Sequence, residues 1–368
     1  MSAQLPLVSD YRALFLSQRP LLDVRAPVEF NEGAFPHTTN LPLLNDDERH
    51  QVGICYKQQG QDAAIALGYA LVDEASKAAR IAGWENWARQ HPDGVLYCFR
   101  GGLRSRLTQQ MLFEESGVVV PRVAGGYKAM RRFLLETLAA EATRQKLWVI
   151  GGRTGCGKTD LLQSLPNSVD LEGIAHHRGS SFGRHAQAQP TQINLENALA
   201  IRLLQLSDAP SLVLEDESRA LGSREVPYSL YTPMSIAPLL LLEAGLEERV
   251  QQSYKDYVLD TLHEFQCIYC ADEAFARYSE HVHASLDRIH RRLGGLRHAA
   301  MKGLLDEGLR ALQDDDATPL QEFVRRLLVD YYDPMYDYQI SRKQERIVFR
   351  GERAAVQEWL AQQDGRVT

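Results

Sequence analysis

The amino-acid sequence predicts an α/β protein of two domains, each built around a parallel β-sheet. Two stretches, residues 94–111 and 146–165, support this fold class, because in each a short apolar run meets glycines and then apolar residues at helical spacing. The chain has 368 residues, and domains of roughly 100 to 200 residues make two domains the expectation. We place the boundary so that residues 1–143 form the first domain and residues 144–368 the second, with helical additions toward the C-terminus.

The composition is that of an ordinary globular protein, with 44% hydrophobic and 24% charged residues. The formal net charge of -7 excludes a molecule-wide basic field, so any nucleic-acid contact must come from a local patch. The 5 cysteines and the lack of a signal peptide favour free thiols in a reducing cytoplasm. No apolar run approaches the roughly 20 residues that cross a bilayer. We therefore expect a cytoplasmic protein without a membrane segment, and we expect a monomer.

The first stretch places a cysteine where a strand passes into a helix. Val95–Tyr97 predict a short buried strand, and Cys98 follows at its C-terminal end. Backbone N–H groups of the glycine turn and of the helix start converge there, and nearby arginines add positive charge, which favours a nucleophilic thiolate. We therefore predict that Cys98 is catalytic; the alternative is a buried structural cysteine. The residues predicted to bind an anion beside it are Arg100, Gly101, Gly102, Arg104 and Ser105.

Two segments of the first domain resemble a known family. Residues 21–42, LLDVRAPVEFNEGAFPHTTNLP, are similar to the opening segment of rhodanese-type sulfurtransferase domains, and Cys98–Ser105 are similar to their active-site loop. The resemblance implies a rhodanese-like domain with three layers. Arg104 lies six residues after Cys98, one more than is usual in rhodaneses, and this Cys-x5-Arg spacing resembles the anion loop of cysteine phosphatases. A longer loop can form a wider ring of N–H donors, so we expect a larger atom or a tetrahedral oxyanion to bind there.

The second stretch contains a phosphate-binding motif, the P-loop. Lys146–Ile150 predict a strand, and Gly152–Thr159 match the pattern G-x-x-x-x-G-K-[ST] in full, with an apolar helix after them. In such a loop the backbone N–H groups bind a di- or triphosphate, Lys158 reaches the outer phosphates and Thr159 can hold Mg²⁺. No chemistry is assigned to the Cys156 thiol. The predicted diphosphate-binding residues are Gly152, Arg153, Thr154, Gly155, Cys156, Gly157, Lys158 and Thr159.

Acidic and polar residues follow two further predicted strands of the second domain. Ser211–Ser218 predict an apolar strand ending in acids, where Glu215 or Asp216 could position Mg²⁺; the alternative is that the acids only cap the strand. Residues 176–183 predict a substrate loop at the C-terminal edge of the sheet. The adjacent His176 and His177 suggest zinc, but no partner pair lies at ligand spacing, so we assign no metal site.

Two C-terminal segments combine residues that could contact RNA. Residues 285–302 predict a basic helix that could follow a phosphate backbone, and residues 331–346 place tyrosines beside bases, which could stack on unpaired nucleotides. The alternatives are a solvated helix face and a packed seam between domains. The candidate RNA contacts are Arg288, Arg291, Arg292, Arg297, Tyr331, Tyr332, Arg342 and Lys343. Cys267 and Cys270 form a lone C-x-x-C in an apolar, strand-like run, for which core packing is expected.

The combination of a rhodanese-like domain and a P-loop domain in one chain resembles the bacterial tRNA 2-selenouridine synthases. The resemblance implies a transferase that acts on tRNA with 2-thiouridine at the wobble position and replaces the 2-thio group by selenium from selenophosphate. It also implies attachment of a geranyl group from geranyl diphosphate to the sulfur, which leaves more readily once it is alkylated. The P-loop would then hold the diphosphate of the prenyl donor, and Cys98 would carry selenium as a selenylsulfide. No tightly bound cofactor is implied; Mg²⁺ could assist, and an enzyme that makes selenophosphate could be a partner.

Three other activities fit the same motifs. One is an ATP-dependent tRNA sulfurtransferase that activates a base with the P-loop and delivers a persulfide from Cys98. Another is a Cys-x5-Arg phosphatase fused to a kinase-like module, against which Tyr97 counts because those phosphatases usually carry a histidine there. The third is a tRNA-binding protein without catalysis, in which Cys98 would be dispensable.

Overall fold

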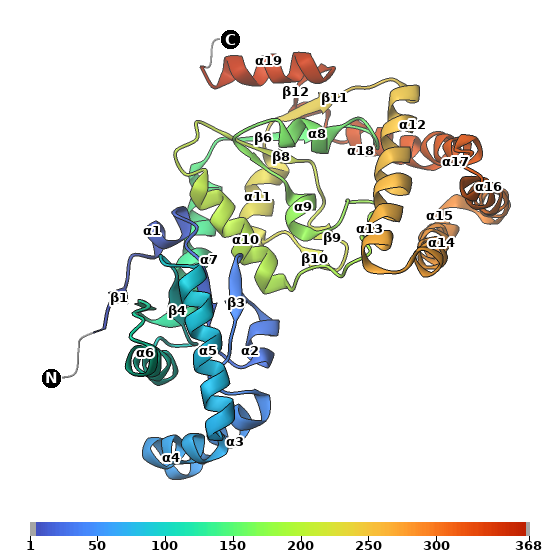
Figure 1. The fold of residues 1–368 in the computed structure, drawn as a ribbon. Helices are drawn as coiled ribbons and strands as arrows, with labels where there is room; N and C mark the ends of the chain where they lie inside the picture. Colours follow the sequence, from blue (N-terminus) through green and yellow to red (C-terminus); the bar gives the residue numbers. More distant parts are fainter. Residues whose placement is uncertain (1–4, 366–368) are drawn as a thin grey trace. The chain divides into compact units, whose positions relative to one another are not determined.

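The computed structural model describes residues 5–365 and divides them into two compact units. The first unit contains the residues up to Ala140 together with Thr191–Gln205, and the second contains Glu141–Pro190 and the residues from Leu206 onward. Each unit contains a five-stranded sheet (Figure 1). All neighbouring strands within these two sheets are parallel, which confirms the predicted α/β class.

The sheet of the first unit has the order β1-β5-β4-β2-β3. Leu22 and Leu96 are fully buried in its central strands, as expected for strands covered on both faces. The register pairs Asp23 with Tyr97, so the residues that follow both strands, Cys98 among them, meet at one edge of the sheet. The strands are β1 (Leu7–Val8), β2 (Leu21–Asp23), β3 (Thr38–Asn40), β4 (Val95–Tyr97) and β5 (Arg122–Val123).

Helices cover both faces of this sheet. Leu96 packs in one core with Trp84 and Leu112, whereas the ring of its neighbour Tyr97 contacts Phe35 and Tyr127. Successive strand residues point to opposite faces, so these are two separate cores. The helices are α1 (Tyr11–Leu16), α2 (Pro27–Glu32), α3 (Asp46–Gln59), α4 (Gln61–Leu71), α5 (Glu74–Gln90), α6 (Leu103–Ser116), α7 (Gly126–Arg144) and α10 (Gln192–Gln205).

The sheet of the second unit has the order β12-β11-β6-β8-β7, with β6 in the centre. Ile150 and Leu214 in its inner strands are fully buried. The edge strand β12 comes from near the C-terminus, and a separate antiparallel hairpin joins β9 and β10. The strands are β6 (Leu147–Gly151), β7 (Ser168–Val169), β8 (Leu212–Glu215), β9 (Ala220–Leu221), β10 (Arg224–Glu225), β11 (Leu239–Leu242) and β12 (Ile347–Gly351).

The predicted helical additions form a cluster with its own core in the second unit. Tyr278, Leu305 and Leu320 are buried in this core. The helices and helical turns of the unit are α8 (Lys158–Gln163), α9 (Leu171–Ala175), α11 (Tyr228–Ile236), α12 (Leu246–Tyr254), η1 (Lys255–Leu259), α13 (Asp260–Ile268), α14 (Ala271–Arg288), α15 (His290–Leu293), α16 (Gly295–Gln313), α17 (Thr318–Leu327), η2 (Leu328–Tyr332), α18 (Asp333–Ser341), η3 (Gln344–Arg346) and α19 (Arg353–Gln363). No helix within residues 5–365 is both long and apolar enough to cross a bilayer.

Two local predictions were wrong. The helix expected over residues 285–302 is interrupted twice: α14 ends at Arg288, and Gly294, with a φ of +84°, ends α15 and separates it from α16. Cys267 and Cys270 do not lie in a buried strand, because Cys267 is on α13, Cys270 precedes α14, and both thiols are exposed. An apolar run of this length suits either a strand or one face of a helix, and here the helical cluster decided the outcome.

Candidate active site

Cys98 lies where β4 ends, five residues before α6 begins at Leu103. Only 3% of the residue is exposed. Its Sγ lies 3.2 Å from Ser105 Oγ, and the Ser105 hydroxyl donates a hydrogen bond to the Gly102 carbonyl at 3.1 Å. The predicted position of the thiol between strand and helix is therefore confirmed, and Ser105 is its hydrogen-bond neighbour.

The loop after Cys98 is held against the start of α7. The N–H groups of Tyr127 and Lys128 donate to the carbonyls of Cys98 and Phe99, each at 2.9 Å. Gly101 and Gly126 have φ values of +62° and +59°. A Cβ atom on Gly101 would lie 2.6 Å from the Val123 carbonyl oxygen, so only glycine permits this close approach.

The backbone N–H groups of this loop are free to bind a ligand. Among residues 5–365, no acceptor takes a hydrogen bond from the N–H groups of residues 99–104. Free N–H groups at the start of a helix of this length attract anions. The loop can therefore bind an oxyanion next to the Cys98 thiol.

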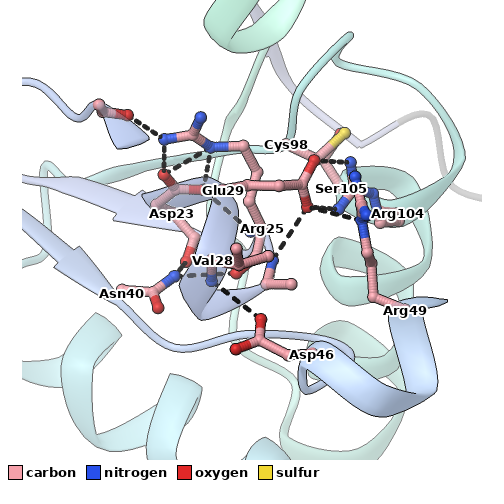
Figure 2. Close-up of polar contacts among 12 residues, drawn as sticks. Asp23, Arg25, Val28, Glu29, Asn40, Asp46, Arg49, Cys98, Arg104 and Ser105 are labelled. Carbon is pink, nitrogen blue, oxygen red and sulfur yellow. Dashed lines mark hydrogen bonds and ion pairs between the residues drawn. The ribbon is translucent and has the colours of Figure 1, made fainter. Parts of the chain in front are cut away.

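The two arginines predicted to bind the anion have different surroundings, and Figure 2 shows those of Arg104. Arg104 forms a two-pronged ion pair with Glu29, with N–O distances of 2.5 and 3.0 Å. Burial opposes the charge of Arg104, but the hydrogen bonds and charge of Glu29 outweigh it and raise the pKa of the guanidinium. Arg100 is exposed and has no ion-pair partner among the described residues, so it keeps its charge available for a ligand.

A buried ion pair fixes the neighbouring strand end. Asp23 holds Arg25 at 2.6 Å, and Arg25 also donates to the Gly33 carbonyl at 2.7 Å, as the upper part of Figure 2 shows. The Arg25 guanidinium carbon lies 3.9 Å from the centre of the Tyr127 ring. Burial raises the pKa of Asp23 despite its arginine partner. These contacts give the Asp-Val-Arg segment a structural role in orienting the loops around Cys98.

A large cavity opens beside Cys98 within the first unit. Its volume is about 1000 Å³, and Cys98, Arg100 and Arg104 line one part of it. Half of the remaining lining residues lie on α3, α4 and α6, and the lining as a whole is largely apolar. The sequence did not indicate this cavity, because its walls come from segments that are far apart in the chain.

The phosphate-binding motif of the second unit has the predicted strand–loop–helix context. β6 ends at Gly151, and α8 begins at Lys158. The Lys158 ammonium donates to the carbonyls of Gly152 and Arg153 at 3.1 and 3.3 Å, and thus folds back over the loop. Burial opposes its charge, but ionisable neighbours, Cys156 first among them, outweigh burial and raise the pKa of Lys158.

Other residues of this motif contact the helical cluster. Arg153 donates to the Asp337 carboxylate at 2.8 and 2.7 Å. Arg249 donates to the Thr154 carbonyl at 3.0 Å and forms an ion pair with Asp333. The Thr154 hydroxyl is buried and has no partner among the described residues. Helices α12 and α18 thus support the loop, a role that the motif alone did not indicate.

The acids after β8 have separate partners. Asp216 pairs with Lys343 at 2.6 Å, so Lys343 neutralises a site carboxylate instead of extending toward solvent. Glu215 accepts a hydrogen bond from the Leu171 N–H at 2.8 Å, while its other oxygen is buried and has no partner within residues 5–365. Burial, followed by the charge of Asp170, raises the pKa of Glu215.

Glu172 and Glu217 also belong to this site and were not predicted. Burial, followed by the charge of Glu172, raises the pKa of Glu217 to about 8. The charge of Lys158 opposes the shift at both carboxyls. Carboxyls with shifted pKa values beside a phosphate loop are typical of functional sites. The signal available in the sequence was their position after the strands β7 and β8.

Three potential metal ligands meet near the loop over residues 176–183. Ligand atoms of His176, His185 and Glu264 lie within 4.8 Å of one another, the one such group among the described residues. His185 Nδ1 lies 2.7 Å from Glu264, and the Arg178 guanidinium approaches the same carboxylate at 3.5 Å. Glu264 therefore already has a cationic partner. The spacing of histidines in the sequence did not indicate this arrangement, because its third member is a glutamate far along the chain.

The candidate RNA contacts fall into three groups. Arg291, Arg292 and Arg297 are exposed on α15 and α16, and their side chains form no hydrogen bond or ion pair with another described residue. Arg288 and Arg342 are exposed but bonded, Arg288 to the Ser181 carbonyl at 2.7 Å and Arg342 to Tyr338 at 3.1 Å. The prediction for Tyr331 and Tyr332 was wrong, because both rings are buried in the helical cluster and cannot stack on a base.

Comparisons with a family model and with individual proteins point to the same family. A family model described as the tRNA 2-selenouridine synthase AAA domain matches residues 145–366. The tRNA 2-selenouridine synthase of Hahella chejuensis is 51% identical over 96% of this chain and 93% of its own. Those of Cupriavidus necator and Pseudomonas fluorescens are 52% and 51% identical, each over 96% of this chain and 97% of its own. The chain therefore belongs to the tRNA 2-selenouridine synthase family.

Proposed function

We propose that this protein is a tRNA-modifying transferase that converts wobble 2-thiouridine to 2-selenouridine with selenophosphate, through an S-geranyl intermediate made from geranyl diphosphate. The observation that carries the proposal is the Cys98 loop, in which a thiol and unbonded N–H groups share one cavity. The phosphate-binding loop and the names of the relatives support the donor and the substrate class. Because tRNA and free thiols occur together in a reducing compartment, we place the reaction in the cytoplasm.

The first step alkylates the sulfur. The sulfur of 2-thiouridine attacks C1 of geranyl diphosphate, the C–O bond breaks, and diphosphate leaves with the electron pair. Loop N–H groups and the Lys158 ammonium would bind the diphosphate and stabilise its growing charge. Mg²⁺ would add positive charge at the same oxygens, and Thr159 and the free oxygen of Glu215 are oxygen donors of the kind it prefers.

The second step replaces the alkylated sulfur. A selenylsulfide on Cys98 would need a two-electron oxidant, because selenium in selenophosphate is already at the selenide level. A redox-neutral route begins when the Cys98 thiolate adds to C2 and the bond from C2 to the geranyl-bearing sulfur breaks. The geranylthiolate leaves with the electron pair and takes a proton from water. The selenium of selenophosphate then displaces Cys98 from C2. Hydrolysis of the P–Se bond yields 2-selenouridine and phosphate.

Binding of selenophosphate would use the predicted anion loop. The N–H groups of residues 99–104 and the exposed Arg100 would hold its phosphoryl oxygens, while Arg104 is held in place by Glu29. Exposed arginines on α15 and α16 would contact the tRNA backbone. Selenophosphate must come from an enzyme that phosphorylates selenide, because the loop binds the donor without making it.

Mass spectrometry of the wobble nucleoside tests this function. Purified protein is incubated with thiolated tRNA and geranyl diphosphate, selenophosphate or both donors. We expect S-geranyl-2-thiouridine with the first donor alone and 2-selenouridine only when both are present. Exchange that depends on ATP and forms no geranylated nucleoside would contradict the proposal and favour the sulfurtransferase alternative.

A further inference from the structure

The cavity beside Cys98 is larger and more apolar than an oxyanion requires. Its volume of about 1000 Å³ is that of a pocket for an organic ligand, and such pockets are mainly apolar with a few polar groups that fix orientation. Selenophosphate is small, charged and fully hydrated, and the loop N–H groups suffice to bind it. The rest of the cavity therefore fits a second, apolar ligand at the same thiol.

Residues from three helices form the apolar wall. Val52 lies on α3, Ala64 and Ile65 lie on α4, and Leu107 and Met111 lie on α6. Ala64 and Cys98 are both buried members of this lining, so the cavity combines the thiol with aliphatic side chains. An apolar chain placed there would lose contact with water and gain contact with these side chains.

Charged residues, more of them basic than acidic, line the same cavity. Arg49, Lys57 and Arg100 are exposed members of its lining, and the exposed acids Glu32 and Glu74 belong to it as well. A ligand with an apolar tail and an anionic head would match this distribution, with its tail beside Ala64 and its phosphates near the exposed cations. A nucleotide of RNA that carries a hydrocarbon chain has this chemistry, whereas a free inorganic anion has only the head.

We propose that this cavity binds the prenyl chain carried by the sulfur of the wobble nucleoside while Cys98 reacts at C2. This inference rests on the proposed function and adds a place for the leaving group. As the bond from C2 to sulfur breaks, the electron pair leaves on sulfur, and the cavity holds the chain of the departing thiolate until it is protonated by water. Helices α3 and α4 thus form a substrate-binding element that selects for a long apolar S-substituent.

The test compares two synthetic anticodon stem-loops that differ only in the S-substituent of the wobble 2-thiouridine, geranyl in one and methyl in the other. Selenophosphate is the second substrate, and the readout is kcat/KM for 2-selenouridine formation. We expect the wild-type protein to prefer the geranyl substrate tenfold or more. Ile65→Trp fills the cavity and Met111→Gln makes its wall polar, and each should lower this preference at least tenfold.

A neighbouring position supplies the matched control. Ala66 lies on α4 next to Ile65, is exposed and does not line the cavity, so Ala66→Trp should leave the preference unchanged. Conversion of the methyl substrate reports folding of each variant. A wild-type preference that neither cavity variant alters would overturn the inference while the proposed function stands. A wild-type protein that converts neither stem-loop would overturn the proposed function and this inference with it.

Discussion

Cys98 and Lys158 both belong to a strand–loop–helix segment of a parallel sheet, but Cys98 begins its glycine-containing loop, whereas Lys158 follows its loop as the first residue of the helix. The Cys98 loop is fixed through carbonyls that accept hydrogen bonds from α7, which leaves its N–H groups free. The Lys158 ammonium instead donates to carbonyls of its own loop. A phosphate that arrives at Lys158 must compete with these carbonyls, whereas an anion at Cys98 meets unoccupied donors.

Replacement of Cys98 separates the two proposed steps. Cys98→Ser should abolish formation of 2-selenouridine, because the serine hydroxyl is a far weaker nucleophile than a thiolate, and should leave S-geranylation largely intact. Both products are measured by mass spectrometry of the same tRNA. Equal loss of both activities would contradict the division between the two units.

Removal of the Lys158 charge tests the diphosphate site. Lys158→Ala should weaken binding of geranyl diphosphate by tenfold or more, because a half-buried ammonium contributes strongly to phosphate binding. Titration calorimetry measures the affinity. Lys146→Ala is the control, since Lys146 packs over the Trp148 ring of the same unit and lies outside the motif. Unchanged affinity in Lys158→Ala would remove the loop from donor binding.

We predict that the free energy of unfolding depends on pH through the Glu217 carboxyl. Burial raises its pKa from the usual 4.5 to about 8, so the folded protein keeps a proton that the unfolded chain releases at lower pH. The carboxyl therefore favours the folded state fully below pH 4.5, and this contribution is lost as the pH rises toward 8. Glu217→Gln keeps a neutral side chain at every pH and should avoid the loss.

Denaturant unfolding at pH 6 and pH 9 measures this effect. At pH 9 we expect Glu217→Gln to be more stable than the wild-type protein by roughly 1 to 3 kcal/mol, with a smaller difference at pH 6. Glu358→Gln on α19 is the exposed control and should change neither value. Parallel pH profiles for wild type and Glu217→Gln would show that the carboxyl is ionised in the folded protein.

At the scale of elements, α10 is the least expected component of the first unit. It comes from residues that follow the phosphate-binding loop, yet it packs with α1. Asn197 on this helix is fully buried and donates to the Ala34 carbonyl at 2.8 Å, while its oxygen accepts from Arg131 at 2.8 Å. The helix thereby covers the segment that holds Arg25 through Gly33.

Loss of the Asn197 hydrogen bonds should destabilise the first unit. Asn197→Ala leaves the buried Ala34 carbonyl without its donor and removes one acceptor of Arg131, which keeps its ion pair with Glu196. We expect a cost of about 1 to 3 kcal/mol of unfolding free energy. Urea denaturation measures the change. Asn86→Ala on α5 removes an exposed amide and serves as the control, for which a change within about 0.5 kcal/mol is expected. Equal stability of the two variants would contradict a structural role for α10.

Helices α14, α15 and α16 replace the single helix that the sequence predicts over residues 285–302. The basic positions over residues 285–302 do lie on helices, but breaks at Ile289 and Gly294 divide them among three. The tyrosines at 331 and 332 have the composition of a stacking surface, yet they fill the core of the helical cluster. Composition identifies which groups are present, whereas exposure depends on the packing of other helices.

At the scale of the whole molecule, the net charge of -7 opposes tRNA, so binding must depend on local cations. Substitution of Arg291, Arg292, Arg297 and Lys302 by Gln should weaken tRNA binding. It should also reduce the slope of log affinity against log salt by roughly 3, because fewer counterions are released. Filter binding at several salt concentrations measures both quantities.

Arginines that already have acidic partners provide the control for this experiment. Arg325 and Arg326 on α17 form ion pairs with Glu322, and Arg325 also pairs with Glu247. Their replacement by Gln should leave the salt slope unchanged, because their charge is neutralised within the protein. An unaltered slope in the quadruple variant would exclude α15 and α16 as the tRNA surface.

The sequence by itself determined the parts of this protein that depend on local order along the chain. The strand, glycine turn and helix around Cys98 and around Lys158 each occupy about 20 contiguous residues, and the spacing of apolar and glycine residues encodes them directly. The acids at the end of β8 were found in the same way, because a strand and its C-terminal residues are adjacent in sequence.

Only the tertiary structure decided the contacts between segments that are distant in the chain. The pairing of Arg104 with Glu29, the return of α10 to the first unit and the apolar cavity beside Cys98 all join such segments. Each depends on which faces of several helices pack together, and the chain's local pattern carries no signal for that choice. Local propensity thus located the reactive groups, and packing determined which charges remain free and what can lie next to the thiol.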